Sequence, residues 1–201
     1  MDTVTALNKF RQQVEMFVPL NETEWQVLMP LLELIALKKK QNFIEPGMIA
    51  NHIGLVVKGS VRYFYVKDGE EITNYFSFEN EFVSSYKSFL TRQPCSNYIQ
   101  TLEDTLIVVL NYSNLQLLYA NPLIGHKMER FGRLVAEFYL LCYEDRMSSF
   151  VTQTPEERYN QLLETGGEVL QRIPQHYIAN FLGITPVSLS RIRRRIMKIS
   201  A

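Results

Sequence analysis

The residues with the clearest chemistry are cations near the C-terminus. Residues 169–201 contain six Lys or Arg and no Asp or Glu. Because the 201-residue chain has a formal net charge of zero, the preceding residues must carry minus six. Cations gathered in this way neutralise phosphates and release condensed counterions, which drives nucleic-acid binding. The six are Arg172, Arg191, Arg193, Arg194, Arg195 and Lys198.

Two short helices are expected to position these cations. Residues 174–184 have apolar side chains at helical spacing, and Gly183 then offers the left-handed conformation in which helices end. Thr185-Pro186 supplies an N-cap and a proline at the first helical position of a second helix. Two helices joined by a turn of about three residues, the second one basic, are typical of a helix-turn-helix. The apolar residues of the second helix that share one face are Leu189, Ile192, Ile196 and Ile199.

A helix-turn-helix inserts its second helix into the major groove with the N-terminus leading. Nearest the base edges we expect Pro186, Val187, Ser188 and Arg191. Nearer the phosphates we expect Gln175, Arg193, Arg194 and Arg195. The alternative is an amphipathic helix that packs on its own domain and leaves its arginines in water.

Composition restricts the other function classes. Hydrophobic residues make up 46% of the chain and aromatic residues 12%, which allows a substantial core in one large domain or two small ones. The sequence has no run of about 18 apolar residues, its first residues do not resemble a signal peptide, and its two cysteines suggest no disulfide framework. We therefore expect a cytoplasmic protein with no membrane partner.

The pattern of residues does not indicate catalysis or metal binding. The three histidines, His52, His126 and His176, fall in different segments, and none lies near a nucleophile motif. We expect no catalytic residue, no metal site and no enzyme. A small β-barrel enzyme, which is the rival class, would need a convergent cluster of His or carboxylates.

Regularly spaced turns divide the first half of the chain. Helices are expected at 7–17 and 22–32, the second opened by a capping box of Asn21 and Glu24. Turn signals at 45–47, 58–59 and 67–69 then alternate with runs of β-branched and aromatic residues. This pattern predicts a β-sandwich or roll, with strands at 53–57, 61–66, 72–76, 98–101 and 106–110.

A long helix is expected from Pro122 to Phe150. Its apolar residues alternate four and three apart, the spacing of a seam between paired helices. We expect it to pair with a second copy of the chain, and the alternative is a single helix lying on the roll. Thr154-Pro155-Glu156-Glu157 then starts a further helix. The seam residues are Ile124, Met128, Phe131, Leu134, Val135, Phe138, Leu141 and Cys142.

Residues 178–192 resemble the DNA-binding motif of the cyclic-AMP-receptor (Crp/Fnr) family of bacterial transcription regulators. Thr185, Pro186 and Arg191 match that motif, which adds Thr185 to the expected DNA-contacting residues. Val187 stands where the family usually has a base-reading Glu. Because valine cannot accept a hydrogen bond from cytosine N4 but can pack on a thymine methyl, the resemblance leaves the target half-site open.

The turn region resembles the cyclic-nucleotide-binding β-roll of the same family at Pro46-Gly47, at 53–62 and at 67–71. The two resemblances imply an α+β fold: an N-terminal cyclic-nucleotide-binding-like β-roll with flanking helices (1–120), a long dimerisation helix (121–150) and a C-terminal winged-helix-like helix-turn-helix domain (151–201).

The ligand pocket departs from the family pattern. Glu81 and Phe82 stand at the ribose-binding position, but Cys95-Ser96-Asn97 replaces the usual Arg-Ser/Thr-Ala that holds the cyclic phosphate. Without that arginine the phosphate would lose its main charge-assisted partner, so we do not expect cyclic-nucleotide binding by the usual mode. Arg92 and Arg62 are the nearby arginines that could substitute.

The pocket candidates are therefore Glu81, Phe82, Arg92, Cys95 and Ser96, with no cofactor assigned. The dense aromatic residues of this region fit either core packing or a pocket for an apolar or planar ligand. Cys95 fits either an inert small hydrophobe or a redox-sensitive thiol.

These features predict a homodimeric DNA-binding transcription regulator of Crp/Fnr type, controlled by an unidentified effector in the roll. The expected partners are double-stranded DNA, a second copy through residues 122–150, a small-molecule effector and RNA polymerase. The alternatives are a ligand-binding or scaffold module of the same fold that does not regulate transcription, and a constitutive regulator whose roll is only a scaffold.

Overall fold

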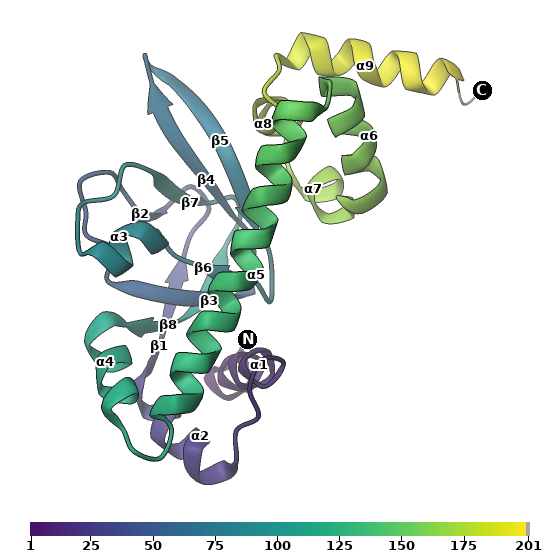
Figure 1. Ribbon diagram of the computed structural model, residues 1–201. Helices are drawn as coiled ribbons and strands as arrows, with labels where there is room; N and C mark the ends of the chain where they lie inside the picture. The colour runs from purple at the N-terminus through teal and green to yellow at the C-terminus, as the bar shows by residue number, and fades with distance from the viewer. Residues whose placement is uncertain (200–201) are drawn as a thin grey trace. The chain divides into compact units, whose positions relative to one another are not determined.

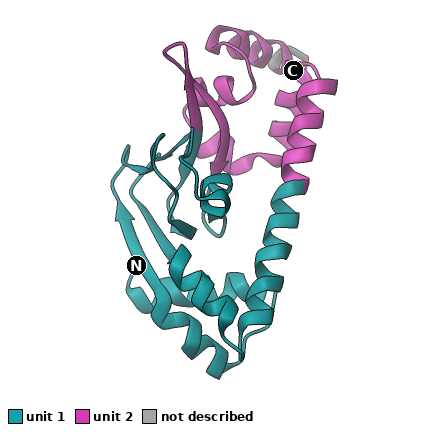
Figure 2. Cartoon of the chain, turned by 60° about the vertical axis from the view of Figure 1, so that its left-hand side comes forward, with its two compact units in different colours: residues 1–63, 77–140 teal, residues 64–76, 141–201 magenta. Residues whose placement is uncertain are grey.

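The computed structural model describes the backbone of residues 1–199 and the side chains of residues 1–196. Two compact units divide the chain (Figure 2). The first unit joins residues 1–63 to 77–140, and the second joins 64–76 to the C-terminal residues from 141 onward. The chain therefore passes between the units three times, twice through one β-hairpin and once within a long helix.

The first sheet has the strand order β1-β8-β3-β6 (Figure 1). Its strands are β1 (Leu32–Leu37), β8 (Thr105–Asn111), β3 (His52–Lys58) and β6 (Phe82–Val83). All its pairs are antiparallel, and Leu55 of β3 lies opposite both Val108 of β8 and Phe82 of β6. Because Leu55–Val57 and Ile107–Leu110 are almost fully buried, the two central strands form the core of this unit.

The second sheet has the strand order β2-β7-β4-β5. Its strands are β2 (Asn42–Ile44), β7 (Tyr98–Thr101), β4 (Val61–Lys67) and β5 (Glu70–Ser77). The turn between β3 and β4 needs Gly59, which has φ +93° and leaves a Cβ only 2.8 Å from the Cα of Thr105. The two four-stranded sheets and this turn confirm the predicted strands.

Helices of the first unit contact β3 and β8 of the first sheet. The helices up to residue 120 are α1 (Thr3–Glu15), α2 (Glu22–Leu28), the single 3-10 turn η1 (Met29–Leu31), α3 (Tyr86–Thr91) and α4 (Tyr112–Ala120). Asn21 and Glu24 form both hydrogen bonds of the predicted capping box. The second predicted helix was too long, because residue 32 already begins β1, whose pairing with β8 takes up the backbone groups that a longer helix would use.

The predicted long helix is α5 (Gly125–Thr152). Its apolar seam is buried at the start and exposed further along. Ile124 precedes the helix, and together with Met128 and Phe131 it is buried within the first unit. Phe138 and Leu141 are 53% and 61% exposed. Residues of the same chain cover the side chains at the start of the seam, and the pairing of this helix with a second copy stays a prediction.

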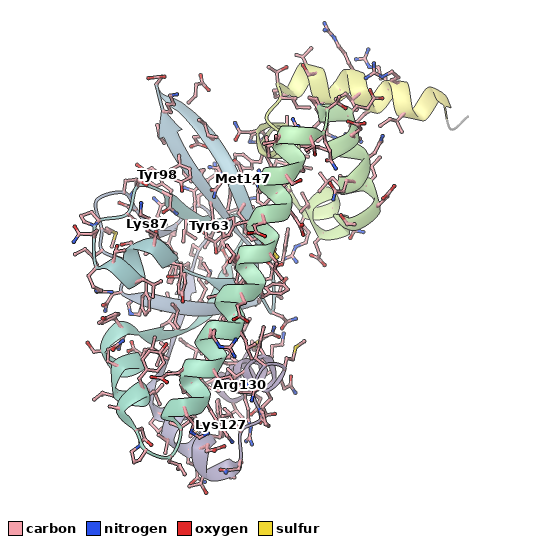
Figure 3. The ribbon with its side chains drawn as sticks, in the orientation of Figure 1. Tyr63, Lys87, Tyr98, Lys127, Arg130 and Met147 are labelled. Atoms are coloured by element: carbon pink, nitrogen blue, oxygen red, sulfur yellow. The ribbon has the colours of Figure 1, made fainter. Side chains whose placement is uncertain are left out.

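An ion pair ties the start of α5 to α2. Lys127 Nζ lies 2.7 Å from Glu24 Oε1 and also donates to the carbonyl oxygen of Pro19 at 3.0 Å. The Glu24 residue is only 4% exposed. The Lys127 ammonium, and next the backbone N–H of Asn21, hold the pKa of Glu24 below its ordinary value of 4.5. Figure 3 labels Lys127 near the beginning of α5.

Acidification is expected to remove this contribution. Because the folded protein has the lower pKa, the stabilisation is present above pH 4.5 and is lost as the pH falls below that value. Glu24→Gln should therefore be less stable at neutral pH and lose less stability on acidification than the parent chain. Urea unfolding from neutral pH to about pH 3 measures both quantities. Equal acid sensitivity of the two proteins would contradict this assignment.

The C-terminal helices are α6 (Pro155–Thr165), α7 (Gly167–Arg172), α8 (Gln175–Phe181) and α9 (Pro186–Ile199). Thr154 caps α6 with both hydrogen bonds of a capping box, as predicted. Residues 153–199 contain no strand, so the described part of this region has no wing. Among the described residues, no helix is long and apolar enough to span a membrane.

Candidate nucleic-acid interface

The junction between α8 and α9 follows the predicted local signals. The N–H of Ile184 donates to Ala179 O and that of Gly183 to Asn180 O, which is the Schellman pattern that ends α8. Gly183 has φ +72°, and a Cβ there would lie 3.0 Å from the ring of Phe150. The turn therefore requires glycine. We call residues 175–199 the α8–α9 pair.

The start of α9 is capped by the residues expected from the sequence. The backbone N–H of Ser188 donates to Thr185 Oγ1 at 3.2 Å, and the two hydroxyl oxygens lie 3.0 Å apart. Pro186 occupies the first helical position, where its missing N–H leaves no hydrogen bond unmade. Both hydroxyls lie at the N-terminal end of α9, the end expected to lead into a groove.

One face of α9 packs on α8, and the other is exposed. Leu189 and Ile192 are 2% and 7% exposed, and Ile178 of α8 and Leu182, which caps its C-terminal end, are also buried. Val187, by contrast, is 61% exposed. Among the residues expected to contact DNA, Ser188 and Arg193 are half-buried. The others are exposed: Gln175, Thr185, Pro186, Val187, Arg191, Arg194 and Arg195.

Arg195 already has a carboxylate partner. Its guanidinium makes two hydrogen bonds to Glu156 at the start of α6, one of them from Nε to Oε1 at 3.0 Å. This pair offsets part of the charge that Arg195 would offer to a phosphate. Arg194 is therefore a stronger candidate for phosphate contact than Arg195, and Arg191 keeps its expected place near the base edges. The side chains of Lys198 and Ile199 lie outside the described residues.

Two arginines hold the C-terminal end of α8. Arg146 of α5 donates to Phe181 O at 2.9 Å, and its guanidinium lies 3.7 Å from the centre of the Phe181 ring. Arg158 of α6 donates to Leu182 O at 2.9 Å and stacks on Phe150. Burial, and next the charge of Arg158, lower the pKa of Arg146 to about 10, so the Arg146 guanidinium stays charged at neutral pH. Both positions suit a cation, because carbonyl oxygens gather at a helix C-terminus.

The candidate pocket residues of the first unit are largely occupied within the chain. The ring of Phe82 packs edge-on against Phe131 of α5 at 5.5 Å, and its backbone N–H donates to Tyr139 Oη at 2.9 Å. Glu81 Oε2 accepts from the N–H of Phe78 at 3.3 Å. The glycine missing before Glu81 is replaced by Asn80, which itself adopts φ +70°. Through its contacts with Phe131 and Tyr139, Phe82 helps to position α5.

Arg92 also has a structural role. It ends α3 in a left-handed conformation with φ +56° and donates to Ala50 O at 2.9 Å and to Asn51 Oδ1 at 3.0 Å. Its guanidinium stacks 4.2 Å from the centre of the Tyr112 ring. Arg62, the other substitute considered, is 1% exposed on β4.

Cys95 is buried, and Ser96 beside it is exposed. The Cys95 thiol lies 2.9 Å from Glu45 O, a contact that closes the 45–47 turn. Sequence reasoning missed the neighbouring polar pair, in which Ser85 Oγ donates to Asn97 Oδ1 at 2.8 Å. The sequence signal that could have revealed this pair is Asn97, which stands where the family usually has alanine. Tyr63 and Tyr98, labelled in Figure 3, come from β4 and β7 of the same sheet.

Comparison with known proteins gives a family match for part of the chain. Residues 34–121 match the family model of the cyclic nucleotide-binding domain. No curated protein sequence matches the chain. Among the described residues, no group of three or more His, Cys, Asp or Glu is placed to hold a metal.

Solved structures of bacterial regulators share the fold over most of the chain. The c-di-GMP-responsive regulator CLP of Xanthomonas campestris is 16% identical, with a TM-score of 0.69, over 87% of this chain and 91% of its own. FixK2 of Bradyrhizobium japonicum is 18% identical, with a TM-score of 0.65, over 84% and 86%. A Crp/Fnr-family regulator of Eubacterium rectale is 17% identical, with a TM-score of 0.68, over 89% and 84%. At these identities the likeness concerns the fold: the chain has a fold similar to that of these regulators, and residues 34–121 within it are similar to the cyclic nucleotide-binding domain.

Proposed function

We propose that the protein is a DNA-binding transcription regulator of Crp/Fnr type. The observation that carries the proposal is the division of α9 into a buried face at Leu189 and Ile192 and an exposed face with Val187, Arg191 and Arg194. A helix held on another helix by its apolar side, with a capped N-terminus and outward arginines, has the properties needed to enter a major groove. The α8–α9 pair is, in this proposal, a helix-turn-helix.

A gel shift with pooled genomic fragments tests the proposal. The expected result is retention of a subset of fragments, weakened by added salt and stronger than for bulk DNA. If correctly folded protein bound no DNA at low salt, the proposal would be refuted. Sequencing the retained fragments would also report the half-site, where Val187 favours contact with a thymine methyl.

The proposed regulator acts as a homodimer through α5. Beyond the part of α5 buried in the first unit, its exposed apolar residues include Phe138, Leu141 and Met147, the last 71% exposed and labelled in Figure 3. Such residues on one long helix are typical of an interface with a second copy. A two-fold dimer would present two α9 helices to successive major grooves, so a near-palindromic operator is expected.

Leu141→Asp is expected to dissociate the proposed dimer. An aspartate at each copy of this position would place two carboxylates in an apolar seam, and we expect the dimer dissociation constant to rise by about 100-fold or more. Sedimentation velocity over a concentration series measures the change. Leu117→Asp on α4, which is 62% exposed, is the matched control outside α5. A parent chain that is monomeric at all concentrations would contradict the interface.

Regulation in this proposal is a two-state change. An effector in the roll alters how the roll packs on α5, and this shifts the two α9 helices into or out of groove spacing. The bound regulator then acts through RNA polymerase. The effector class stays unassigned, because the residues that would replace the family's phosphate-binding arginine are engaged within the chain.

A constitutive regulator with the roll as scaffold is the second candidate. It is favoured by the internal contacts of Phe82, Arg92 and Cys95, which stabilise the domain without a ligand. Native mass spectrometry of the purified protein separates the two candidates. A retained small molecule at stoichiometric occupancy supports the effector-controlled regulator, and unoccupied protein with full DNA affinity supports the scaffold.

A further inference from the structure

Asn180 of α8 is hydrogen-bonded to the backbone of β5 through both polar atoms of its side chain. Its Nδ2 donates to Glu71 O at 2.6 Å, and its Oδ1 accepts from the backbone N–H of Thr73. Residues two apart in a strand direct their backbone polar groups to the same side. Since β5 ends the strand order of its sheet, the Asn180 amide takes the place that a peptide group of a further strand would take.

The residues that follow Asn180 are fixed by other elements of the second unit. The Phe181 ring lies 5.3 Å from the ring of Phe76 on β5, and Phe181 O accepts from Arg146 of α5. Leu182 O accepts from Arg158 of α6. Three consecutive residues, immediately before the turn at Gly183, are thus each held by a side chain or strand from elsewhere in this unit.

The pairing requires the chemistry of asparagine. A primary amide presents one donor and one acceptor side by side, as a peptide group does. Aspartate would direct a second acceptor at Glu71 O, and leucine would offer neither group. Glutamine keeps both groups on a side chain that is one methylene longer. The contact is therefore specific for the side chain as well as for its position.

We propose that Asn180 is a positioning residue that sets the register of the α8–α9 pair on the β4–β5 hairpin, and thereby the place where α9 presents Arg191 to DNA. This inference rests on the proposed function. The backbone groups that Asn180 binds belong to Glu71 and Thr73 of β5. A shift of the β4–β5 hairpin therefore moves these groups. The α8–α9 pair then follows the hairpin through a contact of two hydrogen bonds.

The experiment combines amide hydrogen exchange with DNA binding for Asn180→Leu, Asn180→Asp and Asn180→Gln. The matched control is Asn160→Leu, at an exposed position of α6. In the Leu and Asp variants we expect exchange of the Thr73 amide to accelerate by about 10-fold or more, since its acceptor is lost or repelled. The Gln variant should regain part of the protection, and the control should match the parent chain.

DNA affinity is measured on a mixed-sequence duplex of about 30 base pairs, long enough for two major-groove contacts. We expect the Leu and Asp variants to bind about 10-fold more weakly, with partial rescue in the Gln variant. Unchanged exchange at Thr73 would overturn the register contact. Accelerated exchange with unchanged or increased affinity would overturn the positioning role. If the parent chain bound no DNA, the proposed function would fail, while the exchange data would still decide the contact.

Discussion

Replacing Arg191 and Arg194 together by Glu is expected to weaken DNA binding by about 100-fold or more near 0.1 M salt. Both side chains are exposed on the outward face of α9, and each replacement turns a counterion-releasing cation into an anion. In a dimer the change applies to both copies of the helix. Fluorescence anisotropy with a labelled duplex measures it. Because neither residue belongs to the buried face, the free energy of unfolding should change little.

Two control variants separate local contact from net charge. Lys39→Glu with Lys40→Glu makes the same charge change at exposed residues of the first unit and should weaken binding far less. Arg195→Glu should have an intermediate effect, because Glu156 already binds this guanidinium. If the Lys39 and Lys40 variant lost as much affinity as the α9 variant, binding would depend on net charge and not on α9.

Phe131→Ala is expected to lower the free energy of unfolding by about 3–5 kcal/mol. Phe131 is 5% exposed, and its ring packs edge-on against Phe17 at 5.8 Å and against Phe82 at 5.5 Å. The substitution removes the aromatic contacts of α5 with Phe17, which follows α1, and with Phe82 of β6, and the site can collapse only in part. Urea unfolding followed by circular dichroism measures the loss.

Leu117→Ala on α4 is the comparison for this core variant. Leu117 is 62% exposed, so its truncation should change stability by about 0.5 kcal/mol or less. A loss below about 1.5 kcal/mol for Phe131→Ala would contradict the assignment of Phe131 to the core of the first unit.

Features encoded locally were predictable from the sequence. The caps at Asn21 and Thr154, the glycine turns at Gly59 and Gly183, and the proline at the start of α9 each depend on a few neighbouring residues. Their hydrogen bonds or φ angles are those that the residue types require. The strands between the turns could be predicted for the same reason.

Contacts between distant residues were not predictable in this way. A seam with four-and-three spacing does not say which part faces the same chain, and α5 buries Met128 while exposing Phe138. The packing of the Phe82 ring on Phe131, 49 residues further along the chain, is another such contact. Asn180 pairs with residues more than a hundred positions earlier, and helical periodicity carries no information about such a partner.

The dependence of DNA affinity on salt tests the central claim most directly. If exposed arginines of two α9 helices neutralise phosphates, the logarithm of the binding constant should fall linearly with the logarithm of salt concentration, with a slope of about −4 or steeper. In the Arg191→Glu and Arg194→Glu double variant this slope should flatten. A parent chain whose binding is independent of salt, or a double variant with the parent slope, would contradict α9 as the DNA-contacting helix.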